Sequence, residues 1–127
     1  LKEKSLTMLK KIDRLIAELA PYNAQLVAAT KYASPQQMQT IAETNPTIIF
    51  GENRLQSAIE KQSVCNSINN PWHFIGHLQR NKLRKVMDLF DLIHSVDSFR
   101  LLDAIQNVGI KTEIKANILI QLNYQLN

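Results

Sequence analysis

The sequence is poor in the residues that mark several protein classes. Its 127 residues include one cysteine, three glycines and four prolines, and 6% of them are aromatic. A lone cysteine, Cys65, excludes an internal disulfide framework and favours a reducing, cytoplasmic setting. The low glycine and proline content excludes collagen and low-complexity disorder. We therefore expect one small globular domain over residues 1–127.

Long apolar runs and a strong net charge are also absent. No stretch approaches the roughly 20 apolar residues that span a bilayer, and the charges within residues 1–20 exclude the apolar core of a signal peptide. The net charge of +4 is a mild excess that suits small anions. A basic run at 80–85 has no interleaved aromatic residues, so it indicates a solvated helix face. We expect neither membrane nor nucleic-acid binding.

Short apolar runs alternate with amphipathic segments along the chain. Strands are predicted at 26–31, 47–50, 72–76, 91–96 and 116–123, and helices at 1–20, 35–45 and near 54–62, 80–90 and 98–108. This alternation indicates successive βα units and a parallel sheet, either doubly wound or a (β/α)₈ barrel. No glycine-rich phosphate-binding motif follows any strand, which disfavours the doubly wound form. We therefore expect an α/β fold, an incomplete (β/α)₈ TIM barrel of about five units.

Local signals set several of the helix boundaries. Ser34 followed by Pro35 has the pattern of an N-cap and a first helical residue. Ser98, with the preceding aspartate, is a second N-cap candidate. In the helix that follows, Phe99 is predicted to point inward, and Gly109 is predicted to end the helix.

Polar residues gather where the predicted strands end. In parallel α/β proteins the chemistry lies at the C-terminal ends of the strands. All five predicted strands deliver polar side chains there: Lys31 and Tyr32, then Glu52, Asn53 and Arg54, then His77 and Gln79, then His94, Ser95 and Asp97, and finally Gln121 and Asn123. This convergence on one rim is more informative than any single member.

Lys31 is the sharpest of these candidates, since it directly follows an apolar strand. A lysine in a partly desolvated pocket loses its charge more readily and becomes a nucleophile for aldehydes. The alternative is a solvated lysine where a strand reaches the surface, and the residue pattern alone favours that alternative.

Other reactive residues carry weaker signals. His73 and His77 are four residues apart in a predicted strand, which separates them by about 13 Å, so we expect no metal site. Cys65 lies in a predicted polar loop without a basic partner, which disfavours a catalytic thiol. No pair of carboxylates with acid–base spacing is evident.

Five sequence blocks together resemble one known family. The blocks are VAATKY at 27–32, FGENRLQ at 50–56, WHFIGHLQRNK at 72–82, IHSVDS at 93–98 and ILIQLN at 118–123. In this order and with these gaps, they closely resemble the pyridoxal phosphate homeostasis proteins (the YggS/PROSC type). The resemblance covers essentially the whole chain. It implies a fold-type III barrel that binds pyridoxal phosphate, like the N-terminal domain of alanine racemase.

The resemblance also implies roles for single residues. Lys31 matches the family lysine that holds pyridoxal 5'-phosphate as a Schiff base, and Asn53 matches an asparagine beside the cofactor ring. His77, Ser95 and Asn123 match rim positions of the same pocket. The family is thought to bind and deliver the cofactor and to keep vitamin B6 in balance, so no turnover reaction is expected.

Two alternatives stay open at this stage. Family members are considerably longer, and the strands and phosphate-cupping loops that follow their fifth strand have no counterpart among residues 1–127. The chain is therefore expected to be the N-terminal portion of such a barrel, and a truncated, non-functional fragment is one alternative. An amino-acid racemase-like enzyme is the other. Open sheet edges at 26–31 and 116–123 would invite self-association.

Overall fold

The structure, a computed structural model, describes residues 2–124 and contains one curved parallel sheet. Its strands lie in sequence order, and a helix precedes each of them. The strands are β1 (Val27–Ala29), β2 (Ile49–Glu52), β3 (Trp72–Phe74), β4 (Leu92–Val96) and β5 (Ile118–Ile120), and the helices are α1 (Lys2–Leu19), α2 (Pro35–Thr44), α3 (Leu55–Val64), α4 (Leu83–Leu89) and α5 (Phe99–Thr112), with 3₁₀ turns at Ala20–Tyr22 and Arg80–Lys82.

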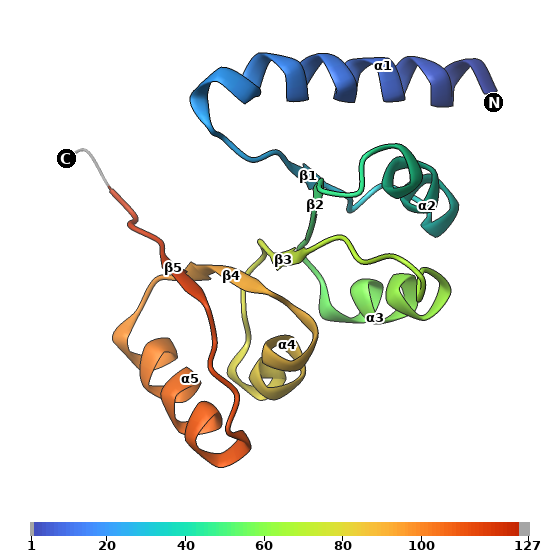
Figure 1. Cartoon of the computed structure of the whole chain (residues 1–127). Helices are drawn as coiled ribbons and strands as arrows, with labels where there is room; N and C mark the ends of the chain where they lie inside the picture. Colours follow the sequence, from blue (N-terminus) through green and yellow to red (C-terminus); the bar gives the residue numbers. More distant parts are fainter. Residues whose placement is uncertain (1, 125–127) are drawn as a thin grey trace.

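Every neighbouring pair of strands is parallel, in the order β1-β2-β3-β4-β5. Figure 1 shows α2, α3, α4 and α5 along the outer side of the curved row of strands. A doubly wound sheet reverses its strand order at a switch point, whereas a barrel adds each strand beside the last. The strand order therefore confirms the prediction of five units of a barrel-type α/β fold.

The hydrophobic core lies between the sheet and this outer layer of helices. Phe50 on β2 is fully buried, and its ring meets the Trp72 ring of β3 edge-on, with centroids 5.6 Å apart. Phe74 makes a similar edge contact with Phe90 at 5.2 Å. The helices contribute further buried side chains, among them Met38, Ile41, Ala58, Leu83, Val86, Leu101 and Ile105. These contacts pack the helices against the strands.

Both predicted N-caps are confirmed. Ser34 forms a capping box with Gln37: the Ser34 Oγ accepts from the Gln37 backbone N–H at 3.1 Å, and the Gln37 Oε1 accepts from the Ser34 N–H at 2.8 Å. Ser98 Oγ accepts from the Leu101 N–H at 3.1 Å, so α5 begins where the sequence predicts. Caps of this kind satisfy backbone donors that the first helical turn leaves free.

Two predictions about the α5 helix are wrong. The helix does not end at Gly109 but continues to Thr112, and Glu113 caps it with a left-handed φ of 58°. A Cβ on Gly109 would lie 2.9 Å from the Ile114 carbonyl oxygen, so this glycine gives room for the returning chain. Phe99 is 85% exposed rather than inward-facing, because the first helical position precedes the part of α5 that packs on the core.

Other predicted ranges also shift, since the first strand shortens from 26–31 to Val27–Ala29 and the third from 72–76 to Trp72–Phe74. The second strand lies at Ile49–Glu52 instead of 47–50. It can include the charged Glu52 because the buried Lys61 donates a hydrogen bond to the Glu52 carboxylate. The fifth strand shortens from 116–123 to Ile118–Ile120, since it pairs with β4 alone and the register shifts between Ile93 and Val96. The helix predicted near 80–90 is a 3₁₀ turn followed by α4.

The two edges of the described sheet are β1 and β5, each paired on one side. Self-association through these edges stays a prediction. None of the described helices has the length and hydropathy needed to cross a bilayer.

Candidate functional site

The five predicted site residues lie at or beyond the C-terminal ends of the strands. Lys31 follows β1, Asn53 follows β2, His77 follows β3, Ser95 lies within β4, and Asn123 follows β5. Parallel strands place these ends along one edge of the sheet. The strand order nevertheless puts Lys31 and Asn123 at opposite ends of the row.

Lys31 lies in a tight turn that begins where β1 ends. The Ala33 N–H donates to the Thr30 carbonyl at 2.9 Å, so Lys31 and Tyr32 are the two central residues of this turn. The Lys31 side chain is exposed, and its Nζ lies 5.1 Å from the centroid of the Tyr32 ring. Lys31 is therefore solvated, the alternative that the residue pattern alone favours, because β1 is an edge strand with a neighbour on one side only within residues 2–124.

Asn53 and His77 come together at the ends of the two central strands β2 and β3. Both line a cavity of about 280 Å³, together with Arg54, Gln79 and Lys82 among others. The approach is close because Gly76 has no side chain: a Cβ there would lie 2.6 Å from the Asn53 Cα. This cavity offers amide, imidazole and cationic groups, a donor set suited to an anionic ligand.

Ser95 and Asn123 lie in a different part of the rim. Ser95 is buried, and its Oγ has no hydrogen-bond partner among the described residues. The Asn123 Nδ2 donates to the Asp97 carboxylate at 3.5 Å, and its Oδ1 accepts from the Gln121 amide at 3.1 Å. The structure thus joins Asn53 to His77 and places Asn123 beside Asp97, while no hydrogen bond links Lys31 to the other four within the described part of the chain.

A histidine pair on β3 and β4 was not predicted from the sequence. The His73 Nδ1 and the His94 Nε2 are 2.9 Å apart. Burial lowers the pKa of both imidazoles, and the charge of His94 lowers the pKa of His73 further, against a smaller opposing effect of Asp91. A neutral pair can share this hydrogen bond, with one ring donating and the other accepting. His73 and His77 share a segment of the sequence, whereas in the sheet the partner of His73 is a histidine of the next strand.

A buried polar network on the helix side of the sheet was missed as well. Lys61 of α3 donates from Nζ to the Glu52 carboxylate oxygens at 2.8 and 3.1 Å and to the Thr30 carbonyl at 2.7 Å. Thr30, Glu52 and Lys61 are 2%, 1% and 7% exposed. The sequence signal was present: Lys61 lies three residues after Ala58 and six after Leu55, in the apolar stripe of its helix. Glu52 was treated as a rim residue, and its side chain is instead buried.

Cys65 differs from its prediction in two respects. It is 4% exposed rather than in a polar loop, and its Sγ lies 3.2 Å from the Pro35 carbonyl. It also has a basic neighbour: burial raises the pKa of the thiol, and the charge of Lys61 partly lowers it. A buried thiol with a raised pKa is a poor nucleophile, in keeping with the expectation that it is not catalytic.

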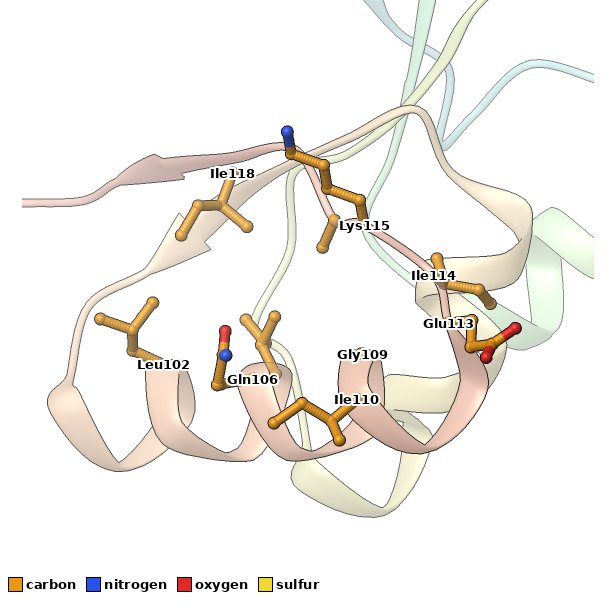
Figure 2. Close-up of a pocket in the computed structure, with 10 residues that line it drawn as sticks. Leu102, Gln106, Gly109, Ile110, Glu113, Ile114, Lys115 and Ile118 are labelled. Atoms are coloured by element: carbon orange, nitrogen blue, oxygen red, sulfur yellow. The ribbon is translucent and has the colours of Figure 1, made fainter.

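A groove of about 470 Å³ lies away from this rim, between α5 and the segment that leads into β5. Figure 2 shows its lining, which includes the apolar Leu102, Ile110 and Ile118 and the polar Gln106 and Glu113. None of the five predicted site residues lines this groove. The candidate site therefore stays at the strand ends.

Comparison with known proteins gives a consistent result. The chain is 32% identical over 119 residues to the pyridoxal phosphate homeostasis protein of Helicobacter pylori strain J99, covering 92% of this chain and 53% of that protein. It is 35% identical over 125 residues to the human protein of the same name, covering 88% and 43%. No family model matches the chain. The chain spans about half the length of these curated relatives.

Solved structures agree in fold. PipY of Synechococcus elongatus, a member of the COG0325 family solved without PLP, superposes with a TM-score of 0.85 at 30% identity, covering 94% of this chain and 55% of that one. The chain matches the pyridoxal phosphate homeostasis protein family in sequence and fold. PipY solved with PLP bound gives a TM-score of 0.80 at 32% identity, covering 87% and 51%. The family resemblance and the fold class predicted from the five sequence blocks are confirmed.

Proposed function

We propose that this chain binds pyridoxal 5'-phosphate through Lys31 and acts in keeping the pyridoxal phosphate pool in balance, without a turnover reaction. The observation that supports this most strongly is its similarity to PipY, which has been solved with PLP bound. The curated relatives carry the name of the homeostasis function. A cytoplasmic location is part of the proposal, since the one cysteine is a free thiol.

The residues at the rim fit this cofactor. Pyridoxal phosphate supplies an aldehyde, with which an uncharged primary amine forms a Schiff base and releases water. The exposed Lys31 amine is within reach of such a molecule. Asn53 and His77 line the cavity at the ends of β2 and β3 and can donate hydrogen bonds to an anionic ring substituent. The Ser95 hydroxyl is a buried polar group that lacks a partner among the described residues, as expected where a ligand would supply one.

The candidate residues have different roles in binding. Lys31 provides the covalent anchor, and its turn fixes where the amine can reach. Asn53 and His77 orient the ring, while Lys82 and Arg54 at the same cavity contribute positive charge. A racemase-like enzyme would need a second proton-transfer group opposite the lysine. The curated relatives are named for homeostasis of pyridoxal phosphate, and this name supports binding rather than turnover.

The test is to find which lysine reacts. The chain is mixed with pyridoxal phosphate, reduced with borohydride and mapped by peptide mass, alongside Lys31→Ala and the surface control Lys85→Ala. We expect the label on Lys31, its loss in Lys31→Ala and its retention in Lys85→Ala. Label spread evenly over the exposed lysines would overturn the proposed anchor. Racemisation of an amino acid by the loaded protein would overturn the absence of turnover.

A further inference from the structure

We propose that the buried pair of Glu52 and Lys61 is a positioning device for Lys31, acting through the carbonyl of Thr30. This inference rests on the proposed function of Lys31 and deepens it. The pair lies in the helix layer, on residues that none of the predicted cofactor contacts includes. Its role follows from where its hydrogen bonds end.

The Thr30 carbonyl accepts two hydrogen bonds. One comes from Lys61 Nζ at 2.7 Å, and the other comes from the Ala33 N–H at 2.9 Å, which closes the turn around Lys31. This carbonyl belongs to the same rigid peptide plane as the Lys31 nitrogen. Lys61 therefore holds the plane from which the Lys31 backbone starts, and the direction of the Lys31 side chain depends on it.

Glu52 holds Lys61 in place. Its two carboxylate oxygens accept from Lys61 Nζ at 2.8 and 3.1 Å, and Ser57 Oγ lies 3.4 Å from one of them. The Thr30 hydroxyl contacts the other oxygen and lies 3.1 Å from the Gly51 carbonyl. The backbone of Thr30 joins the same ladder, since its N–H donates to Gly51 at 2.9 Å. Residue 30 is thus held by its amide, its hydroxyl and its carbonyl.

Stability alone does not account for such a pair. Removing two charges from water is costly, and replacing a buried ion pair with neutral groups of similar volume is often neutral or stabilising. Lys31 differs from Lys61 in this respect. Its side chain is exposed after an edge strand, so burial does not fix its direction. An exposed lysine that acts as a covalent anchor needs a fixed backbone, and Lys61 of α3 fixes it by its hydrogen bond to the Thr30 carbonyl.

The first test needs no cofactor. Amide hydrogen exchange is measured in the wild-type chain, in Lys61→Met and in the doubly neutral Glu52→Gln/Lys61→Met, with Lys85→Met as the surface control. We expect the Ala33 amide to exchange about tenfold faster or more in both pair variants, once its turn loses the second donor. The Ile93 amide, which donates to Asn117 at 3.0 Å, serves as a distant reference and should be unchanged. Equal acceleration at both amides would show a merely structural pair and overturn the proposal.

The second test adds pyridoxal phosphate and reports on orientation. For each variant, the dichroism of the cofactor band is measured per mole of reduced label on Lys31. We expect Lys61→Met and the double variant to lose at least half of this signal and to react about tenfold more slowly, while Lys85→Met matches the wild type. An unchanged signal with label still on Lys31 overturns the positioning role alone. Absence of label from Lys31 in the wild type overturns the proposed function, and the exchange test still decides whether the pair holds the turn.

Discussion

Gly76 gives the most direct test of how the candidate site is packed. It follows β3, and a Cβ built on it would lie 2.6 Å from the Cα and 2.8 Å from the carbonyl carbon of Asn53. Both are backbone atoms, which cannot rotate away. A normal contact requires the two segments to separate by about 1 Å, and strain of this kind costs roughly 1–3 kcal/mol. We expect Gly76→Ala to lower the free energy of unfolding by about 2 kcal/mol.

Gly51 provides the matched control. A Cβ there would meet the Ile75 Cδ1 at 2.9 Å and the Val27 Cγ1 at 3.0 Å, both ends of side chains that can rotate. Loss of a strand glycine also reduces the entropy of the unfolded chain, so Gly51→Ala should change the free energy of unfolding by less than about 1 kcal/mol. Urea denaturation followed by circular dichroism measures both. Gly76→Ala within about 0.5 kcal/mol of wild type would refute the packing argument.

Two further predictions concern pH and assembly. Burial holds the pKa of His73 and His94 below the ordinary value of 6.5, so the folded state binds fewer protons than the unfolded state, and the stability present above pH 6.5 should fall as the pH drops further. The urea midpoint should therefore be lower at pH 5.5 than at pH 7.5, and His94→Gln should reduce this difference. An equal difference in that variant would contradict the assignment to the histidine pair. The open edge at β5, where Ile120 is 59% exposed, should cause association at micromolar concentration that Ile120→Lys weakens, and light scattering from a sharp wild-type monomer would contradict this.

The sequence predicted the order of elements well because burial on both faces produces apolar runs. The strand around Phe74, which is buried at all three positions, stands out for this reason, and the capping residues Ser34 and Ser98 mark where helices begin. The second strand was misplaced by two residues because it ends in Gly51 and Glu52, which no pattern of apolar residues includes. The place of the charged Glu52 within a strand is explained only by its partner Lys61, which lies nine residues further along the chain.

The strand ends that carry the candidate residues were predicted, but the surroundings of these residues were not. The rule that chemistry lies at strand ends found Lys31, Asn53 and His77 without any knowledge of side-chain contacts. It could not show that Ser95 is buried with a hydroxyl that has no partner among residues 2–124, nor that His73 of β3 meets His94 of β4. Those facts depend on the register between strands, which residues far apart in the chain determine together.

The remaining difficulty for sequence reasoning is that adjacent residues differ in burial and in the groups that they contact. Glu52 points into the helix layer and is 1% exposed, while Asn53, the next residue, lines the rim cavity. Thr30 and Lys31 divide in the same way: the first is bonded to Glu52 and Lys61, and the second is exposed. At the ends of two neighbouring strands, then, a candidate ligand directly follows a buried residue of one network. A substitution of Glu52 or Lys61 should therefore change the position of Lys31 through the peptide bond between Thr30 and Lys31, although the altered side chain does not contact the cofactor.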